Sequence, residues 1–293
     1  MAESVDVIIP AYNARNTIQE ALQSVFSQTV PIARVLVVDD GSTDGTADVV
    51  RHHFPHAEVI TIANSGPSNA RNVGIEKATH EWIAFLDADD RWHPDKLRLQ
   101  WGQAEPDVGL ISTTWVRGSE FPAVPDQIPV TSLGYRDLLQ MNQFQTSTVL
   151  MRREIAQRLG GFDPAVDGAE DWDFWLRASR ITGIRRLEWP LVQYRDMPTG
   201  YSKDVWRVYR TMLPMLDKHR QAPGLSVREF RTIETWHHLR FWVAFQLAHD
   251  SEHARLAWHN AWQRPLRPYV LPAVWRYLAP FLWQRFKRRT ATS

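Results

Sequence analysis

The chain has 293 residues, of which 44% are hydrophobic and 23% are charged. These values are near the average for globular domains, so they exclude a disordered chain, a collagen and a protein built from several membrane spans. Cysteine is absent, which excludes a disulfide framework, a thiolate nucleophile and a cysteine-ligated metal site. The length suits one large domain or two ordinary ones.

Positive charge is concentrated at the C-terminal end. Eight of the 34 basic residues follow Glu252, where no acid occurs, so residues 1–252 carry 26 basic and 33 acidic residues and a net charge of −7. Residues 264–289 combine Arg and Lys with Trp, Tyr and aliphatic residues, which is typical of a segment lying on an anionic membrane surface. A second interpretation has these residues packing on the rest of the chain, with only Lys287-Arg288-Arg289 in solvent.

The N-terminus lacks the basic stretch, the long apolar run and the cleavage site of a secretory signal. We therefore expect a cytoplasmic protein, either free or peripheral on the inner face of the cell membrane. We expect no nucleic-acid partner.

Five short apolar runs, separated by helical patterns, predict strands in the first 114 residues. They lie at residues 5–9, 35–38, 59–62, 82–86 and 110–114. Strands that alternate with helices form parallel βαβ units. The first helix is predicted over residues 18–26, where apolar residues follow a helical period and Thr17 and Glu20 have capping-box spacing. We therefore expect an α/β fold with a mostly parallel central sheet flanked by helices.

The remaining chain predicts a second half and a helical C-terminal region. Residues 115–200 are irregular, with an apolar run at 146–151 and an aromatic helix opened by Glu170-Asp171-Trp172. From residue 201 the pattern is helical, with helices expected near 206–219, 228–249 and 252–262. We therefore divide the chain into residues 1–114, 115–200 and 201–293.

Four of the predicted strands are followed at once by polar and turn-forming residues. The clusters are Pro10-Ala11-Tyr12-Asn13, Asp39-Asp40-Gly41-Ser42, Asn64 to Asn72, and Asp87-Ala88-Asp89-Asp90. In an open parallel sheet these positions share the carboxyl edge, where ligands bind. Turns and helix caps would explain one such cluster, but four at one edge indicate a binding site.

The residue types in these clusters suit a diphosphate and a metal ion. Asp87, Asp89 and Asp90 crowd the end of one strand, which is costly unless a cation lies among them. Carboxylate oxygens suit Mg²⁺ or Mn²⁺, which usually complete their shell with substrate phosphates. Asp39 and Asp40 suit the N–H groups of a base or the hydroxyls of a ribose. No glycine-rich phosphate loop occurs, so dinucleotide binding and P-loop ATP hydrolysis are disfavoured.

Together these segments resemble the inverting family 2 glycosyltransferases with a GT-A fold, of the bacterial polysaccharide or lipopolysaccharide type. The similarity covers about residues 4–195 and is carried by segments 7–13, 37–44, 70–74 and 85–90 and by Glu170-Asp171. It implies a GT-A (Rossmann-like) sheet with a nucleotide-sugar-binding half at 1–114 and an acceptor-binding half, with the catalytic base, at 115–200. It also implies Mn²⁺ or Mg²⁺ as cofactor and a nucleotide-diphosphate sugar as donor, with UDP favoured over GDP or dTDP. The QxxRW-type signature of processive synthases is absent, so we expect one transfer per acceptor.

The resemblance also implies roles for individual residues. The nucleotide-binding set comprises Pro10, Ala11, Tyr12, Asn13, Asp39, Asp40, Ser68, Asn69, Arg71, Asp87 and Ala88. Asp89, together with Asp87, would hold the metal. Asp171 would be the catalytic base that takes the acceptor's proton, with Glu170 and Trp172 as acceptor-side candidates. Without the upstream motifs, Glu170-Asp171 would be explained as an acidic helix start.

The expected acceptor is a hydroxyl of a saccharide or of a lipid-linked glycan. Two alternatives stay open. A sugar nucleotidyltransferase is disfavoured because no glycine-rich phosphate loop follows the first strand. A catalytically inactive glycan-binding or scaffold protein at the membrane is disfavoured because Asp89 and Asp171 are both intact.

Overall fold

The computed structural model describes residues 4–118, 120–195 and 204–263. The chain divides into two compact units, of which the first is formed by Met1–Leu138 and Asn142–Met197 and the second by Leu139–Met141 and Pro198–Ser293. The separate donor and acceptor halves of the first unit stay a prediction about function. The membrane-surface prediction for residues 264–289 lies outside the described residues.

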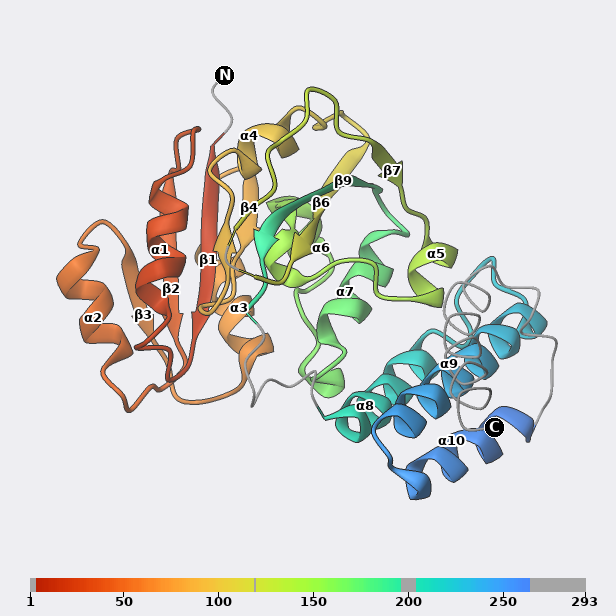
Figure 1. The fold of residues 1–293 in the computed structure, drawn as a ribbon. Coiled ribbons are helices and arrows are strands. Elements are labelled where there is room, and N and C mark those ends of the chain that lie inside the picture. Colours follow the sequence, from red (N-terminus) through yellow and green to blue (C-terminus); the bar gives the residue numbers. More distant parts are fainter. Residues whose placement is uncertain (1–3, 119, 196–203, 264–293) are drawn as a thin grey trace, which may run out of the picture. The chain divides into compact units, whose positions relative to one another are not determined.

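The first four strands of unit 1 form a parallel sheet in the order β3-β2-β1-β4, as expected (Figure 1). The elements of this half are β1 (Val5–Ala11), α1 (Ile18–Phe26), β2 (Arg34–Asp39), α2 (Thr46–His53), β3 (Glu58–Thr61), α3 (Pro67–Lys77) and β4 (Trp82–Phe85). The parallel pairing follows from the alternation of strands and helices along the chain.

Beyond β4 the sheet becomes mixed, so the expectation of a mostly parallel sheet applies to this first half. Strand β8 is antiparallel to both β4 and β6, and the order continues β8-β6-β9-β5, with β7 paired to β9. The elements are β5 (Arg91–Trp92), α4 (Lys96–Trp101), β6 (Val108–Val116), β7 (Val130–Ser132), α5 (Tyr135–Gln140), η1 (Thr146–Thr148), β8 (Leu150–Arg152), α6 (Arg153–Arg158), η2 (Pro164–Val166), α7 (Glu170–Ala178) and β9 (Gly183–Gln193). A strand as short as β8 has too few residues to reveal its direction by pattern.

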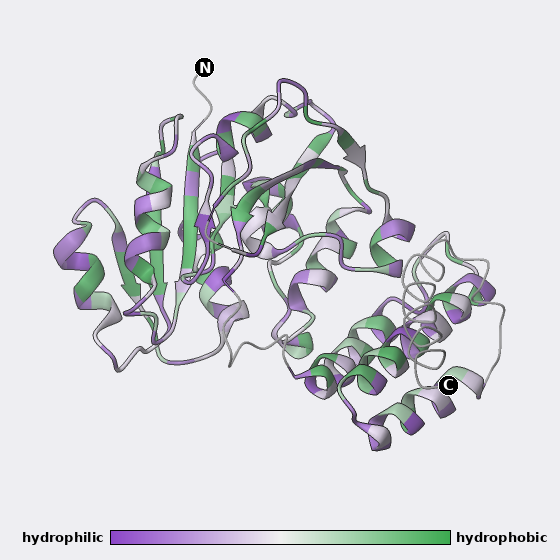
Figure 2. Cartoon of the chain, viewed as in Figure 1, coloured by the Kyte–Doolittle hydropathy of each residue, from purple (hydrophilic) through white to green (hydrophobic). Residues whose placement is uncertain are grey.

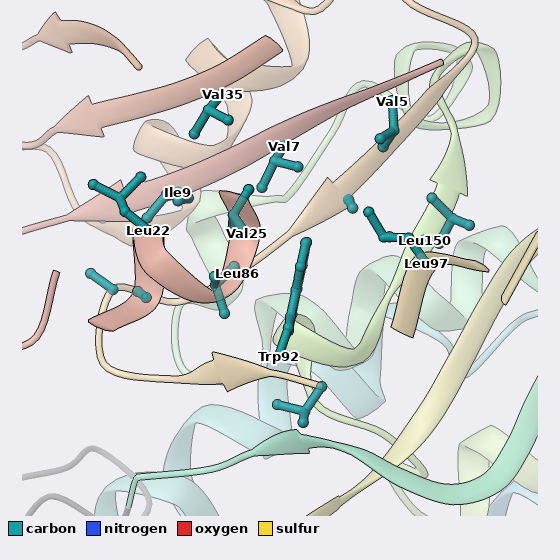
Figure 3. Packing of buried hydrophobic residues seen from close by; sticks show 14 of the residues in the cluster. Val5, Val7, Ile9, Leu22, Val25, Val35, Leu86, Trp92, Leu97 and Leu150 are labelled. Atoms are coloured by element: carbon teal, nitrogen blue, oxygen red, sulfur yellow. The ribbon is translucent and has the colours of Figure 1, made fainter. Parts of the chain in front are cut away.

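Strand β1 is buried on both faces because helices cover both. Val7 and Ile9 belong to the core cluster that includes Leu22 of α1 (Figure 3). Ile8 points the other way, and its Cγ2 atom would lie 2.3 Å from a Cβ added at Gly74 of α3. Alternate residues of a strand face opposite sides of the sheet, so α1 and α3 lie on opposite faces. Figure 2 shows β1 in the hydrophobic colour along most of its length.

The start of α1 differs from its prediction. No side-chain capping hydrogen bond forms at Thr17; its hydroxyl instead donates to the carbonyl oxygen of Ala14 at 3.3 Å. The capping box expected between Thr17 and Glu20 is therefore wrong. The Thr hydroxyl satisfies a nearer carbonyl, which is a common alternative for this residue type.

The described part of unit 2 contains three whole helices, α8 (Val205–Lys218), α9 (Val227–Leu247) and α10 (Ser251–Trp262), besides the end of α5. Helix α9 begins with a capping box in which the Ser226 hydroxyl and the Glu229 carboxylate accept from each other's backbone N–H groups. Helix α10 buries Ala254, Ala257 and Ala261, which repeat at helical spacing and form one face. No helix among the described residues is both long enough and apolar enough to cross a membrane.

Candidate donor and base site

The ends of β1 and β2 bring two of the predicted clusters together. Ala11 pairs with Asp39 in the sheet, so the loops that follow the two strands begin side by side. The Asn13 N–H donates to the Ser42 hydroxyl at 2.9 Å, and the Asn13 Oδ1 atom accepts from the Thr43 N–H at 3.0 Å. Asn13 thus ties the two loops together, and its side chain is occupied in doing so.

Tyr12 is the aromatic side chain that these loops leave in solvent. It is 55% exposed, although its neighbour Ala11 is buried. Exposure of so large a ring at the carboxyl edge suits contact with a flat ligand such as a nucleobase. Pro10 is half-buried, whereas Ala11 is 2% and Ala88 8% exposed. The two alanines can therefore contact a ligand mainly through their backbone.

Asp39 and Asp40 are both buried but have different surroundings. Asp40 accepts from the N–H groups of Ser65 at 2.8 Å and Gly66 at 2.9 Å, one on each oxygen. Asp39 accepts on Oδ1 from the Ser42 N–H at 3.3 Å, and among the described residues its Oδ2 atom has no hydrogen-bond partner. Asp40 therefore shapes the loop before α3, whereas Asp39 keeps an oxygen for a ligand.

The other polar residues at the start of α3 also bond within the protein. The Ser68 hydroxyl donates to Asp167, and the Asn69 side chain donates to the Ser65 carbonyl at 2.8 Å. Gly66 precedes the helix at φ +91°, a conformation that favours glycine. These contacts fix the first turn of α3, from which Arg71 projects one turn later.

Arg71 connects two distant segments of unit 1. Its guanidinium donates to Asp87 after β4 at 2.8 Å and to Glu170 at the start of α7 at 3.1 Å, and it lies 5.3 Å from the centre of the Phe162 ring. Only 6% of the residue is exposed. Burial lowers the pKa of a guanidinium, but Asp87 and Glu170 more than offset this and raise the pKa of Arg71 above its ordinary value. Arg71 is therefore a permanent cation between the two segments.

The carboxylates after β4 carry more negative charge than their surroundings neutralise. Burial and the neighbouring charge of Asp87 raise the pKa of Asp89 to about 6. Asp90 is 2% exposed, and burial together with Asp87 and Asp89 raises its pKa well above the ordinary value. Its carboxylate accepts from the Ser147 hydroxyl at 2.6 Å and from the Arg195 N–H at 3.0 Å. Asp90 therefore supports the loop through both of its oxygens.

Asp171 lies in the first turn of α7 beside Glu170, as predicted from the sequence. Its Oδ2 atom accepts from the Asn142 side chain at 3.0 Å and its Oδ1 atom from the Trp172 N–H at 2.6 Å. Burial and the charge of Glu170 raise the pKa of Asp171 to about 7. A carboxylate with a pKa near neutrality is well matched to accept a proton at physiological pH.

Trp172 differs from its predicted place on the acceptor side. It is 5% exposed, and its indole N–H donates to the Leu138 carbonyl at 2.6 Å. The indole is therefore part of the core, which is the usual position of a large aromatic residue in a helix that packs on a sheet. Glu170 is engaged on both oxygens, by Arg71 and by the Gly168 N–H at 2.6 Å.

Three residues of this site were missed by the sequence reasoning. Ser147 joins Asp87 to Asp90, since its hydroxyl also accepts from the Asp87 N–H at 3.0 Å. Asn142 contacts Asp171, and Arg195 donates from Nε to the Asp89 carbonyl at 3.0 Å. Arg195 comes just after β9. It could have been found by the search for polar residues that directly follow a strand, which identified the other clusters. Ser147 lies in an apolar run and Asn142 in an irregular segment, so neither carried a signal.

Two carboxylates of this site are suited to a divalent cation. The described residues contain no group of three or more His, Asp or Glu side chains arranged to hold a metal ion. Asp87 and Asp89 nevertheless supply hard oxygen ligands, and burial together with the charge of Asp87 raises the pKa of Asp89. Mg²⁺ in particular is usually bound by one or two carboxylates plus substrate phosphates. The residues present therefore fit an ion that is bound together with a diphosphate.

Comparison with known proteins identifies the family. The model of "Glycosyl transferase family 2" matches residues 6–159. The Bacillus subtilis (strain 168) protein TuaG, named for teichuronic acid biosynthesis, is 43% identical over 217 residues, which cover 69% of this chain and 83% of TuaG. The amylovoran biosynthesis glycosyltransferase AmsB of Erwinia amylovora is 31% identical over 252 residues, which cover 80% of this chain and 82% of AmsB.

Solved structures show the same fold. The S. aureus protein TarS 1-349 in complex with UDP-GlcNAc aligns with a TM-score of 0.66 at 20% identity, covering 88% of this chain and 79% of that one. The mannosyltransferase PcManGT of Pyrobaculum calidifontis, in complex with GDP-Man and Mn²⁺, aligns with a TM-score of 0.62 at 24% identity, covering 96% and 82%. The fold is that of the GT-A glycosyltransferases. From the family model and the two relatives, this chain belongs to glycosyl transferase family 2.

Proposed function

We propose that the protein is a metal-dependent, inverting glycosyltransferase that moves one sugar from a nucleotide-diphosphate donor to a hydroxyl of a saccharide or lipid-linked glycan. The observation that carries this proposal is the Arg71 bridge between Asp87 and Glu170. It holds the carboxylates after β4 close to the residue that precedes Asp171. A donor-binding group and a candidate base thereby belong to one charged cluster.

On the donor side, Tyr12 and Asp39 are the side chains free to contact a nucleoside. Tyr12 offers an exposed ring, and Asp39 offers an acceptor oxygen for a base N–H or a ribose hydroxyl. Asp40, Asn13, Ser68 and Asn69 act through the loops that they fix. The TarS complex with UDP-GlcNAc supports UDP as the first donor to test, and the PcManGT complex makes GDP the second.

Asp89 and Asp87 would hold the divalent cation, for which the PcManGT complex with Mn²⁺ provides support. When bound, such an ion offsets negative charge on the diphosphate. Asp171 takes the proton of the acceptor hydroxyl as its oxygen attacks the anomeric carbon from the face opposite the diphosphate. The carbon–oxygen bond to the diphosphate breaks in the same step, so the configuration inverts. Asn142 and the Trp172 N–H orient the Asp171 carboxylate for this role.

The acceptor is a glycan in this proposal. Support comes from the relatives TuaG and AmsB, whose names refer to the biosynthesis of teichuronic acid and amylovoran. We place the protein in the cytoplasm or on the inner face of the cell membrane, where nucleotide sugars are available. A catalytically inactive scaffold needs neither a base nor metal-binding carboxylates, so the clustering of these groups favours an enzyme.

Calorimetry and thermal shift with UDP, GDP, dTDP and CMP, each with and without Mn²⁺, test the donor site. A ligand present at 100 times its Kd should stabilise the fold by about 2.7 kcal/mol. We expect one diphosphate to bind only with metal, and Asp89→Asn to lose this metal-dependent binding. Asp48→Asn, an exposed carboxylate on α2, is the matched control and should bind as wild type does. Failure of every nucleotide to bind with Mn²⁺ or Mg²⁺ would contradict the proposal.

A further inference from the structure

The helical unit contains a cleft that the reaction proposed above does not use. It has a volume of about 600 Å³, within the range of small-molecule sites. Its lining comes from the second half of α8 and Arg220 just after it, from the first half of α9, and from Asn260 and Gln263 at the end of α10. Figure 1 labels these three helices. Its lining residues are Leu213, Pro214, Leu216, Asp217, Arg220, Arg231, Glu234, Thr235, His238, Asn260 and Gln263.

A buried chain of hydrogen bonds sets the state of His238 in this cleft. The Asn260 amide donates to the Tyr209 hydroxyl at 3.0 Å, and this hydroxyl lies 2.8 Å from the His238 Nδ1 atom. The hydroxyl accepts from Asn260 and can donate its own proton to Nδ1, an arrangement that places the imidazole proton on Nε2. Burial lowers the pKa of His238, which favours the neutral ring. In this arrangement His238 offers an N–H donor on its other edge.

The charges in the cleft balance, but one cation is not paired. Arg220 donates to Asp217 at 2.7 Å and to Glu234 at 2.9 Å, which joins the three side chains in one network. The Arg231 guanidinium has no ion pair or side-chain hydrogen bond with any described residue. With two cations, two anions and a neutral histidine, the lining has no net charge.

We propose that this cleft is a saccharide-binding site. A neutral lining that mixes donors with acceptors matches hydroxyl groups, which both donate and accept, better than it matches a phosphate. Arg231 and His238 supply free donors, and the carboxylates and amides of Glu234, Asn260 and Gln263 supply acceptors. Leu213 and Pro214, which are half-buried and exposed respectively, add an apolar surface for the C–H face of a sugar ring. The site lies wholly within unit 2; only its assignment to the acceptor glycan rests on the proposed function.

Isothermal titration of the full chain with chitotetraose, cellotetraose and tetragalacturonate tests this site. We expect at least one oligosaccharide to bind, and Arg231→Ala to weaken it about tenfold through the loss of charged hydrogen bonds. Arg228→Ala is the matched control, since this exposed arginine lies on the same helix and outside the cleft. Leu213→Trp, which fills the cleft, provides a second loss-of-binding variant should Arg231→Ala fail to fold. Melting temperatures establish that each variant is folded.

Binding that is lost in Arg231→Ala or Leu213→Trp and kept in Arg228→Ala supports the site. The proposal is overturned if the wild type binds none of the three at millimolar concentration or if neither cleft variant changes the affinity. Binding of inorganic phosphate in the cleft, without binding of any saccharide, would replace it with an anion site. UDP binding with Mn²⁺, measured on the same wild-type sample, is a separate outcome: its absence contradicts the proposed function and leaves the saccharide result standing.

Discussion

Removing the charge of Asp171 should stabilise the protein at alkaline pH. The carboxylate has a pKa of about 7 in the folded chain against 3.8 for the ordinary group. The folded state therefore holds its proton more tightly than the unfolded state, and stability falls as pH rises from about 4 to about 7. Above that range the folded protein carries the full cost of a half-buried charge beside Glu170.

The size of this effect follows from the shift and the environment. At 1.36 kcal/mol per pKa unit, the whole shift corresponds to at most about 4 kcal/mol, and screening of a half-buried group reduces this to about 1–2 kcal/mol. Asp171→Asn keeps the shape, and turning over the Asn142 amide, which now donates to Asp171 and whose Oδ1 atom is buried without a partner, brings an acceptor to the new amide N–H. We therefore expect a gain of about 1–2 kcal/mol at pH 8 that falls to less than half at pH 5.

Urea unfolding followed by tryptophan fluorescence at both pH values measures this gain. Asp173→Asn is the matched control, because Asp173 lies in the same turn, is fully buried and is paired to Arg177 at 2.7 Å. Breaking this pair should destabilise the protein by about 3–5 kcal/mol. If Asp171→Asn is less stable than wild type at pH 8, or if its gain does not depend on pH, the assigned environment of Asp171 is wrong.

Three further predictions concern catalysis, donor binding and packing. Initial rates at saturating donor should rise with pH through about 7, because Asp171 must lose its proton to act as a base; a rate that falls over this range would argue against that role. Tyr12→Ala should weaken nucleotide binding by about 1–3 kcal/mol if the exposed ring stacks on the base, and Tyr12→Phe should bind as wild type does, both measured by calorimetry. Gly74→Ala should destabilise the fold by about 1–3 kcal/mol in urea unfolding, because the added Cβ would meet Ile8 at 2.3 Å; unchanged stability would show that α3 can shift.

The sequence was most informative where local pattern determines structure. The strands of the parallel half, the helix at Ile18–Phe26 and the helix opened by Glu170 agree with the structure because apolar periodicity governs them. The common edge of the strand ends followed from topology alone. Asp171 could be named from the resemblance, although the family model itself ends at residue 159.

Contacts between distant segments could not be predicted in the same way. Ser147 bonds a carboxylate 57 residues away, and Asn142 bonds one 29 residues away. Such pairs depend on the mixed half of the sheet, where the three-residue strand β8 inserts between β4 and β6. Trp172 was instead assigned to the acceptor side, although its side chain is buried. An aromatic residue beside a candidate base is more often part of the core than a ligand contact. The different roles of Asp39 and Asp40 likewise could not be predicted, because they depend on the loop before α3, whose N–H groups donate to Asp40.

Sugar transfer by the wild type and by Asp171→Asn tests the central claim most directly. Release of the nucleoside diphosphate from its sugar nucleotide is measured with Mn²⁺ and a panel of glycan acceptors, and donor binding is measured by calorimetry on the same samples. We predict that Asp171→Asn binds the donor as wild type does and loses turnover, because a base acts on the transition state more than on the bound ground state. Full turnover by Asp171→Asn would contradict the assignment of the base and the mechanism built on it.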